Sequence, residues 1–524
     1  MRTVIGIELS TQSAKYVVLD ETAAILASGS LAYDERFPQY KTAGGILPHS
    51  DSAVRRTSPL LLLEALDGLF SVLKPFLPHC RAIKCDCMQH ATVYTKKIFS
   101  EKLQILDHEQ SLLQLSDCFS RQAVPIWEDR STAEETLFLV SALAGHGGLE
   151  SKCGNRGECR FAAAQIMKWA KENPAEYSGT VHIQVLSAFV TSILCGKICP
   201  VDTGDGWGTN LNNLSIRFPG WSKILIKQAA AYAGINPKYF AKKLGRMAAY
   251  DKPAGRISAY FSRRYGANPE CIILLGTGDN PATLLGMGAA TTISLGSSYT
   301  VNGVLKKIYT CPGQEYNIFG FIPGTAMALS CITNGSKVHD FFIREYITHG
   351  SKPTAADWFE YQKFTDGQID ANDPLMLPYL ESESVPVKSR GIVRDGFNKS
   401  DTRTNIRALH ISQALSLRLH SKHLASDIIL AAGGGAANAG LCRIIADVFA
   451  KPLHILPQTS FAAPYGCALS CLRIMNKKSY QQIINIAASI AEKIILPDSK
   501  THPAVSVLME RYQKLEKKLI HIGD

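Results

Sequence analysis

Short blocks of apolar residues recur along this chain, and glycine, serine and threonine gather in the turns between them. Near the N-terminus the pattern predicts three consecutive strands, over residues 3–9, 14–19 and from 24 to 27. Apolar residues at helical spacing predict helices over 60–73 and 441–449. Further strands are expected at 82–85, 271–275, 291–293, 299–305, 427–431 and 452–456, and further helices at 162–170, 182–194, 221–233, 283–287 and 463–474. Such a succession of strands and helices is typical of α/β domains.

The length of the chain and a weak internal similarity both predict more than one domain. A chain of 524 residues exceeds the size of a single hydrophobic core. A strand runs into small hydroxyl residues at 7–11 and again at 293–298, and a second strand follows in both places. We therefore expect two similar α/β domains, over residues 1–287 and 288–495, and a charged helical tail over 496–524.

The composition is that of a globular protein. Apolar residues make up 46% of the chain and charged residues 19%. No run of about 18 uncharged apolar residues, the length of a membrane span, is present. The N-terminus lacks the apolar core of a signal peptide, so we expect a cytoplasmic protein that does not bind a membrane. We also expect a monomer or a homodimer. The net charge is +11, but the basic residues form only small clusters, which argues against nucleic-acid binding and fits an anionic small substrate.

The 14 cysteines are scattered at irregular spacing. This arrangement indicates free thiols in a reducing compartment rather than a disulfide framework. Cys85 and Cys87, or Cys153 and Cys159, resemble parts of a metal site, but neither forms a paired CxxC set. Buried or loop thiols are therefore the better interpretation of both.

Asp279 is the most informative residue of the sequence. It lies in segment 276–282 (Gly-Thr-Gly-Asp-Asn-Pro-Ala), between a buried strand and a segment that can begin a helix. The pattern places one carboxylate at the end of a strand, between glycines that let a ligand approach the backbone closely. A carboxylate in this position can act as a general base. An aspartate that caps the following helix fits the same pattern.

Two other turns have the composition of phosphate sites. Segment 294–298 (Ser-Leu-Gly-Ser-Ser) follows a predicted strand, and the backbone N–H groups of such a turn can wrap a phosphate. Segment 433–438 (Gly-Gly-Gly-Ala-Ala-Asn) lies between a strand and a helix, whose N-terminus favours phosphate. Tight packing of a strand on a helix needs similar glycines. A base together with a phosphate turn suggests transfer of a phosphoryl group to a hydroxyl.

Three motifs stand in a fixed order along the chain, and together they resemble a known family. They are segment 7–12 (Ile-Glu-Leu-Ser-Thr-Gln), then 278–282 with 294–298, and then 433–438. This ordered set resembles the FGGY carbohydrate kinases and, within that family, the xylulokinases of eukaryotic type. The likeness extends over residues 3–475. The Gly-Asp-Asn-Pro-Ala and Ser-Leu-Gly-Ser-Ser pair at this separation is its most specific part.

The resemblance implies an actin-like ATPase fold, in which two ribonuclease-H-like α/β domains face each other across a cleft. It implies that the sugar lies deep in the cleft and that ATP is held mainly by the second domain. The implied reaction transfers the γ-phosphate of ATP to the 5-hydroxyl of D-xylulose, with Mg²⁺, and yields D-xylulose 5-phosphate. The residue pattern alone supports only two α/β domains.

The resemblance also implies roles for individual residues. Asp279 is expected to be the general base, and Glu8 and Asp279 are expected near the metal. The residues expected to contact the sugar are Gln89, His90, Arg160, Asp279 and Asn280. The residues expected to contact ATP are Ser10, Thr11, Gln12, Gly296, Ser297, Ser298, Gly434, Gly435 and Asn438.

Several of these residues also have an ordinary structural explanation. His90 fits a structural histidine, and Arg156 competes with Arg160 for the sugar contact. Trp127 belongs to the sugar side in the family pattern, but a lone aromatic side chain is usually part of a core. The acids of segment 202–205 fit a turn with side-chain caps better than a metal loop, because other oxygen ligands are missing at the spacing of a Ca²⁺ loop.

Glu8 departs from the family pattern, which has aspartate at this position. Glutamate keeps the charge but is one methylene longer, and Mg²⁺ demands near-ideal octahedral geometry. This departure leaves open a catalytically weak regulator that binds sugar or ATP. Another FGGY kinase, acting on ribulose, glycerol, fuculose or gluconate, is a second alternative. An actin-like or chaperone-type ATPase is a third, which the Gln89-His90 pair disfavours.

Overall fold

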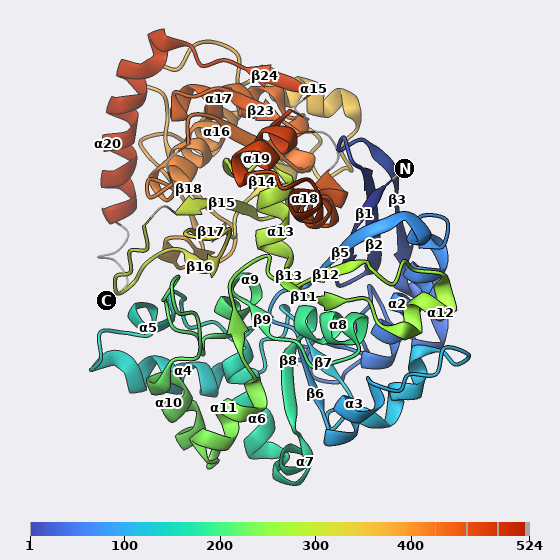
Figure 1. Ribbon diagram of the computed structural model, residues 1–524. Coiled ribbons are helices and arrows are strands. Elements are labelled where there is room, and N and C mark those ends of the chain that lie inside the picture. The colour runs from blue at the N-terminus through green and yellow to red at the C-terminus, as the bar shows by residue number, and fades with distance from the viewer. Residues whose placement is uncertain (1, 306, 425, 457–458, 490–491, 519–524) are drawn as a thin grey trace. The chain divides into compact units, whose positions relative to one another are not determined.

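The computed structural model describes residues 2–305, 307–424, 426–456, 459–489 and 492–518, and Figure 1 labels its elements. The chain forms two compact units. Unit 1 comprises residues 1–288, 306–327 and 460–487, and unit 2 comprises 289–305, 328–459 and 488–524. The sequence prediction places the boundary between its two domains at residues 287 and 288 and a tail after residue 495, whereas the units are discontinuous because the chain returns twice to unit 1.

Unit 1 contains a mixed seven-stranded sheet. Its order is β11 (Pro253–Arg256), β12 (Ile272–Leu274), β5 (Cys80–Cys87), β1 (Thr3–Leu9), β2 (Ser13–Asp20) and β3 (Ile25–Ala32), and β13 (Thr277–Gly278) also pairs with β5. β1, β2 and β3 are antiparallel neighbours, whereas β5 is parallel to both β1 and β12. The smaller ladders of this unit join β4 (Arg56–Thr57) to β7 (Val124–Pro125), β6 (Thr92–Thr95) to β8 (His182–Val185), and β9 (Val201–Asp202) to β10 (Met247–Ala248).

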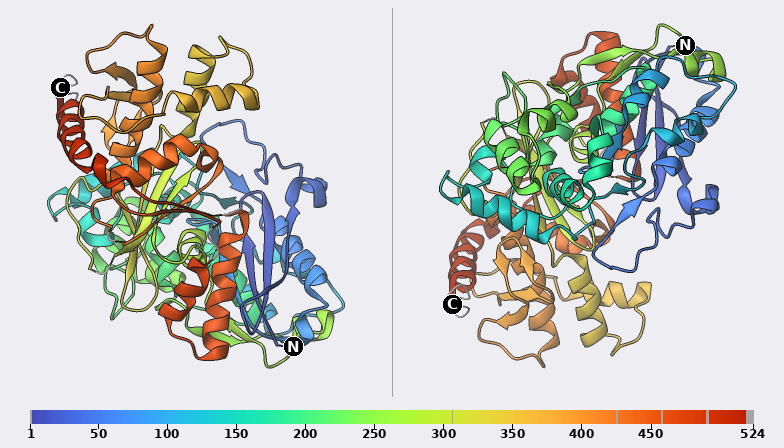
Figure 2. Two further views of the ribbon diagram at one scale, coloured as in Figure 1. Left: turned by 90° about the horizontal axis from the view of Figure 1, so that it is seen from above. Right: turned by 90° about the horizontal axis from the view of Figure 1, so that it is seen from below.

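The helices of unit 1 come from distant parts of the chain. They are α1 (Tyr33–Arg36), α2 (Pro59–Leu73), α3 (Lys97–Lys102), α4 (Ala133–Ala144), α5 (Glu150–Cys153), α6 (Ala162–Glu172), α7 (Pro174–Gly179), α8 (Leu186–Cys195), α9 (Thr203–Gly206), α10 (Lys223–Ala233), α11 (Pro237–Leu244), α12 (Ala259–Tyr265), α13 (Asp279–Gly286), α18 (Ala462–Asn476) and α19 (Tyr480–Ala488). The red α18 lies along the blue strands β1 and β2, although more than half of the chain separates them (Figure 2). The strand β16 (Asn317–Gly320) packs against α9.

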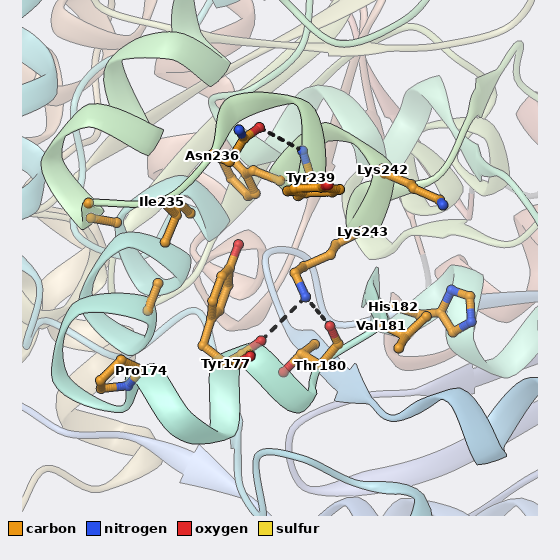
Figure 3. Close-up of a pocket in the computed structure, with 15 residues that line it drawn as sticks. Pro174, Tyr177, Thr180, Val181, His182, Ile235, Asn236, Tyr239, Lys242 and Lys243 are labelled. Atoms are coloured by element: carbon orange, nitrogen blue, oxygen red, sulfur yellow. Dashed lines mark hydrogen bonds between the residues drawn. The ribbon is translucent and has the colours of Figure 1, made fainter.

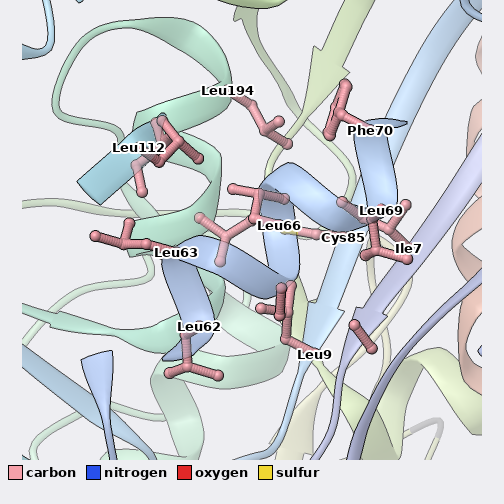
Figure 4. Close-up of a cluster of buried hydrophobic side chains, with 14 of the residues drawn as sticks. Ile7, Leu9, Leu62, Leu63, Leu66, Leu69, Phe70, Cys85, Leu112 and Leu194 are labelled. Atoms are coloured by element: carbon pink, nitrogen blue, oxygen red, sulfur yellow. The ribbon is translucent and has the colours of Figure 1, made fainter. Parts of the chain in front are cut away.

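The two faces of the unit 1 sheet bury different side chains, because successive residues of a strand point to opposite sides. Ile7, Leu9 and Cys85 belong to the apolar core that α2 covers (Figure 4). Gly6 lies on the other face, where a Cβ atom would overlap the carbonyl oxygen of Pro464 in α18. Glycine therefore allows α18 to approach the sheet closely at this point.

Unit 2 is built around a second sheet. Its strands follow the order β17 (Ala326–Ile332), β15 (Tyr299–Leu305), β14 (Thr291–Leu295), β22 (Ile429–Ala432), β23 (Leu453–Ile455) and β24 (Lys493–Ile495). Two short hairpin-like ladders join β18 (Met376–Tyr379) to β21 (Gly391–Arg394) and β19 (Glu383–Ser384) to β20 (Val387–Lys388). The helices are α14 (Ser336–Tyr346), α15 (Ala355–Lys363), α16 (Thr402–Leu419), α17 (Ala439–Phe449) and α20 (His502–Lys518).

Most predicted elements correspond to observed ones, and one is wrong in part. Residues 182–185 form the strand β8, so the helix expected over 182–194 begins only at Leu186. α13 begins at Asp279, four residues before the predicted helix. The predicted helical tail corresponds to α20 up to Lys518, and its last residues lie outside the described part of the chain. None of the described helices combines the length and apolar character that a membrane span requires.

Candidate active site

Acidic side chains gather on the face of the unit 1 sheet that α18 covers. Glu8 on β1 is in register with Lys15 on β2 and with Asp86 on β5. Residues paired across neighbouring strands point to the same face, so these three side chains form one row. Lys15 Nζ donates to Glu8 Oε2 at 3.0 Å. The thiol of Cys467 in α18 lies 3.4 Å from Asp86 Oδ2.

Asp279 extends this row of acids. Thr277 on β13 is in register with Asp86, and Asp279 follows two residues later as the first residue of α13. The N-cap position belongs to Gly278, so Asp279 is not the capping residue that the ordinary explanation required. Burial raises the pKa of Asp279 to about 7, and the carboxylate of Glu8 adds to the rise. A carboxyl group with this pKa is well matched to accept a proton near neutral pH.

Asp86 and Asp205 also belong to this group of acids, and the sequence pattern gave neither a role in it. Both are almost completely buried. Asp205 in α9 accepts a hydrogen bond from the Ser187 hydroxyl at 2.5 Å. Burial raises the pKa of both groups well above the usual range of aspartate, and neighbouring carboxylates, Asp279 among them, raise it further.

We call Glu8, Asp86, Asp205 and Asp279 the acid cluster. Burial also raises the pKa of Glu8, although the ammonium of Lys15 opposes that effect. Four carboxyl groups with raised pKa values retain protons more readily than exposed ones, and a bound cation would favour their ionised forms. The signal for Asp86 in the sequence is a carboxylate inside an apolar strand.

The glycines beside Asp279 are needed for packing within the protein, which corrects the prediction that they leave room for a ligand. A Cβ atom at Gly276 would lie 2.5 Å from Cys85 Sγ, and one at Gly278 would lie 2.7 Å from the side chain of Gln89. Both distances are shorter than real Cβ contacts allow. Only glycine therefore fits at either position.

A chain of hydrogen bonds holds the Asp279 side chain. Asn280 Nδ2 donates to Asp279 Oδ1 at 3.0 Å and lies 2.8 Å from Gln89 Oε1. Gln89 Nε2 in turn donates to the carbonyl oxygen of Gly204 at 2.9 Å. The structure thus brings together three residues that the resemblance assigned to the sugar. Gln89 is buried, and both the oxygen and the nitrogen of its side-chain amide bond to protein atoms. It therefore positions Asn280 within this series of hydrogen bonds.

His90 lies next in sequence with a positive φ of 70°. Its Nδ1 is 2.7 Å from the carbonyl oxygen of Gly208, so this nitrogen carries the proton and donates. Burial lowers the pKa of His90 to about 4, and the nearby Arg160 lowers it further. The ring is therefore neutral near pH 7, and its Nε2 can accept a hydrogen bond from a hydroxyl group.

Arg160 lies close enough to His90 to affect its charge, as the predicted sugar contact requires. Its guanidinium forms an ion pair with Glu158, and Glu158 Oε1 also accepts from Asn317 Nδ2 at 3.1 Å. Arg156 donates its backbone N–H to Asn317 Oδ1 at 3.0 Å. The two arginines therefore share one local network, and the structure gives Arg160 the closer relation to His90.

The predicted phosphate residues of unit 1 form the turn between β1 and β2. Ser10 Oγ donates to the carbonyl oxygen of Ser13 at 2.8 Å. Thr11 Oγ1 accepts from Trp127 Nε1 at 3.0 Å, and Gln12 is exposed. Trp127 is 42% exposed, so the explanation of this residue as part of a core is wrong.

The segment 202–205 contains one cap and one member of the acid cluster. Asp202 is the N-cap of α9 and accepts from the backbone N–H of Asp205 at 2.9 Å. The prediction of a turn with side-chain caps is confirmed for Asp202. It does not account for Asp205, whose side chain faces the acids.

The two glycine-rich turns of unit 2 lie against each other. A Cβ atom at Gly435 would lie 2.9 Å from the carbonyl oxygen of Leu295, just before the turn at Gly296–Ser298. The backbone N–H of Ser336 donates to the carbonyl oxygen of Gly296 at 3.0 Å. Gly435 is thus required for packing, whereas Gly434 has no atom within 4 Å of an added Cβ and borders open space.

A cavity of about 550 Å³ opens beside Gly434 and Gly435, and this volume is within the usual range of small-molecule sites. Its walls carry aromatic and amide side chains, and they are formed by Ser336, His339, Asp340, Ala355, Trp358, Phe359, Gln362, Gly434, Gly435, Ala437, Asn438 and Leu441. Asn438 caps α17 and also bonds to His410 Nε2 at 3.0 Å, so its side chain is fixed. We call this the aromatic cavity.

No group of three or more His, Cys, Asp or Glu side chains in the described part of the chain is arranged to hold a metal ion by itself. Mg²⁺ usually binds through one or two carboxylates and takes its other ligands from water and phosphate. Glu8 and Asp279 supply carboxylates of this kind, although Lys15 already occupies Glu8 Oε2. Cys85 and Cys87 are buried free thiols on β5, and Cys153 and Cys159 are also free, as expected.

Residues 293–475 match the C-terminal domain of the FGGY family of carbohydrate kinases, and they include both glycine-rich turns of unit 2. The chain is thus a carbohydrate kinase, and it is similar to the FGGY family. This kinase is 29% identical to the xylulose kinase of Rattus norvegicus over an alignment of 547 residues, which covers 99% of this chain and 97% of the rat protein.

Solved structures show the fold of this kinase. A xyloylose kinase from Brucella ovis matches with a TM-score of 0.80 and 17% identity, over 99% of this chain and 100% of that one. A gluconate kinase from Lactobacillus acidophilus matches with a TM-score of 0.79 and 16% identity, over 99% and 98%. The predicted actin-like ATPase fold is confirmed. Because kinases named for different sugars match equally well, the fold does not select the sugar.

Proposed function

We propose that this kinase transfers the γ-phosphate of ATP to the 5-hydroxyl of D-xylulose and that Asp279 is its general base. The observation that carries the proposal is the Asp279 carboxyl group, which Asn280 holds beside Gln89 and whose pKa lies at about 7. The similarity to the rat xylulose kinase along nearly the full chain supports the choice of sugar.

Asp279 would take the proton of the attacking hydroxyl while the phosphoryl group moves. Most of the rate enhancement in phosphoryl transfer comes from positioning and charge stabilisation, because the transition state is loose. The base therefore has to be ionised and correctly placed rather than strongly basic. The hydrogen bond from Asn280 supplies the placement, and a pKa near 7 leaves a large ionised fraction at neutral pH.

The sugar would be held by side chains of opposite hydrogen-bonding character. Neutral His90 presents an acceptor at Nε2, because Nδ1 is committed to Gly208. Arg160 presents donors, and its partner Glu158 keeps the guanidinium in place. A hydroxyl-rich ligand needs donors and acceptors in fixed positions, and a site built in this way discriminates strongly against analogues that lack a hydroxyl.

ATP would bind mainly to unit 2. The aromatic cavity offers Trp358 and Phe359 for an adenine ring. The backbone N–H groups of the turns at Gly296, Ser297 and Ser298 and at Gly434 and Gly435 suit phosphate. In unit 1, the turn of Ser10, Thr11 and Gln12 also carries polar groups that suit phosphate. Asn438 would act indirectly, because its side chain is fully used within the protein.

Mg²⁺ fits the carboxylates at the acid cluster. Glu8 and Asp279 would hold it, in part through water, and it would neutralise charge on the phosphates. The Glu8–Lys15 ion pair is relevant here, because Lys15 competes with the metal for one Glu8 oxygen.

An ADP-release assay with D-xylulose, D-ribulose, glycerol, L-fuculose and D-gluconate tests the proposal. We expect D-xylulose among the best acceptors and the product to carry its phosphate on C5. Asp279→Asn should lower kcat by about 10²–10⁴-fold, while calorimetry still detects the sugar. The exposed Asp366→Asn is the matched control and should keep the wild-type rate.

The results separate the parts of the proposal. A better rate with another acceptor refutes the sugar but not the kinase. An unchanged rate for Asp279→Asn refutes the general base.

A weak regulator that binds sugar or ATP remains the second candidate, because Lys15 occupies the glutamate that stands where the family has aspartate. It predicts binding of both ligands without turnover at any Mg²⁺ or Mn²⁺ concentration. Recovery of turnover in Glu8→Asp would identify the glutamate as the cause.

A further inference from the structure

A second group of charged residues surrounds a cavity of about 800 Å³ in unit 1, apart from the acid cluster. Its charged lining residues are Lys197, Arg217, Arg246 and Lys252. The remaining residues of its wall are Ile198, Cys199, Pro200, Ile216, Phe218, Pro219, Met247, Ala248, Ala249, Pro253, Ala254 and Leu275. We call this the basic cavity.

The charge of the basic cavity is unbalanced. Its lining contains four cations and no aspartate or glutamate. All four cationic side chains are exposed, and none forms an ion pair with another residue in the part of the chain that the structure describes. Like charges around a concave surface repel one another and concentrate the field inside it. A polyanion in the cavity would relieve that repulsion.

We propose that the basic cavity binds a small molecule that carries two or more phosphate groups. A phosphate monoester bears about −1.5 to −2 charges near pH 7, so two such groups balance four cations. Arg217 and Arg246 offer planar forks of donors that match phosphate oxygens, and Lys197 and Lys252 add point charges. The cavity volume lies in the range of small-molecule sites.

The backbone that carries these cations is fixed on several sides. The carbonyl oxygen of Arg246 accepts from the N–H of Val201 at 3.1 Å, and β9 and β10 pair directly beyond this contact. The carbonyl oxygen of Lys252 accepts from the N–H of Leu275 at 2.8 Å. Lys197 follows Gly196, whose left-handed conformation ends α8. Binding groups on anchored backbone lose less entropy when a ligand binds.

The chemistry of the lining indicates binding and not catalysis. The basic cavity contains no carboxylate or histidine that could transfer a proton, and its one thiol, Cys199, is buried. The same backbone continues to the site described above, because Val201 precedes Asp202 and Leu275 lies four residues before Asp279. An occupant would therefore contact the segments that lead to Asp202 and to the proposed base, Asp279.

The cavity in Figure 3 differs from the basic cavity, because its Lys243 already has hydrogen-bond partners. It has a volume of about 570 Å³ and lies between α7 and α11, with Tyr177 and Tyr239 in its wall. Lys243 Nζ already donates to the carbonyl oxygens of Thr180 and Tyr177 there. Burial lowers the pKa of Lys243, so its charged form is less favoured than that of an exposed lysine. Among the described residues, the cations of the basic cavity donate no such hydrogen bond from their side chains, although the guanidinium of Arg217 lies 5.1 Å from the centre of the Phe218 ring.

Isothermal titration of the full chain with inorganic pyrophosphate tests the proposal. The double variant Arg217→Ala/Arg246→Ala should bind pyrophosphate at least about tenfold more weakly than wild type, because each lost charge-assisted contact has this order of effect. The control Arg36→Ala/Arg263→Ala removes two exposed arginines of unit 1 that form no ion pair with another described residue. It loses the same net charge and should bind as wild type does.

Four results would overturn the proposal. The first is that wild type binds no pyrophosphate, and the second is that both double variants bind it equally weakly, which would indicate a net-charge effect alone. Unchanged binding in Arg217→Ala/Arg246→Ala would place the ligand at the turns proposed for ATP. Tighter binding of a single-stranded oligonucleotide than of pyrophosphate, lost in the same variant, would replace the small molecule by nucleic acid. Because pyrophosphate is not turned over, the outcome is independent of the proposed sugar.

Discussion

Removal of the Asp279 charge should stabilise this kinase at the same time as it slows phosphoryl transfer. The carboxyl group lies in a poorly solvated position beside other acids, where its ionised form is unfavourable. Asp279→Asn has nearly the same shape, and its amide oxygen can still accept the hydrogen bond that Asn280 Nδ2 donates at 3.0 Å. The substitution therefore removes a charge without opening a cavity.

The magnitude follows from the pKa of Asp279. The ordinary value is 3.8 and the folded protein holds it at about 7. One pH unit corresponds to about 1.4 kcal/mol, so the ionised group destabilises the fold by at most about 4 kcal/mol above pH 7. The side chain keeps some exposure to solvent, which screens the charges, and we expect about 2 kcal/mol.

The stability difference between Asp279→Asn and wild type should depend on pH with a definite sign. Below about pH 4 the carboxyl group is protonated in the folded and the unfolded chain, so the substitution has no electrostatic effect. As the pH rises toward 7, the unfolded chain loses this proton before the folded one does, and wild type loses stability. The advantage of Asp279→Asn should therefore grow from acidic to mildly alkaline pH and then level off.

Urea unfolding followed by tryptophan fluorescence, at a series of matched pH values, measures this advantage. The chain has two compact units, so midpoints of the same transition are compared rather than total free energies. Asp366→Asn is the control and should follow wild type at every pH. An advantage that does not vary with pH, or a lower midpoint for Asp279→Asn at pH 8, would refute the assigned cause.

Three further predictions test other parts of the site. Glu8→Gln removes a charge that raises the pKa of Asp279, so the acidic limb of the pH profile of kcat/KM should move to lower pH; an unmoved limb would contradict this assignment. Gly466→Ala places a Cβ atom against a backbone carbonyl of α13 and should cost about 1–3 kcal/mol in thermal unfolding, whereas Gly145→Ala, with open space around it, should be tolerated. Trp358→Ala should weaken ATP binding by about tenfold, measured by calorimetry, and leave sugar binding unchanged.

The order of the elements was largely predictable, because it depends on residues that are neighbours in sequence. The apolar spacing of 60–73 and 441–449 corresponds to α2 and α17, and the strand expected at 82–85 lies within β5. The error at 182–185 has a physical reason. Segment 182–185 is short and contains both polar and apolar residues, so its pattern does not distinguish a strand from a helix. Its pairing with β6 makes it a strand.

The site was only partly predictable. Asp279 was evident because glycines and a buried strand surround it in sequence. Asp86 and Asp205 were not. A carboxylate inside an apolar strand is the one local signal for Asp86 and does not show which residues it meets, and the sequence around Asp205 is that of an ordinary turn. Their neighbours Cys467 and Ser187 are distant in the chain, and only folding brings them close.

The sequence by itself determined the resemblance to the FGGY kinases, the succession of strands and helices, and the position of the proposed base at a strand end. Those properties depend on local spacing and on ordered motifs. Tertiary structure decided which acids share a face of the sheet, that Gly276 and Gly278 are needed for packing, and that four dispersed cations line one cavity. It decided them because burial and Coulomb interactions depend on distances in space, and β1, β5, α9, α13 and α18 meet only when the chain has folded.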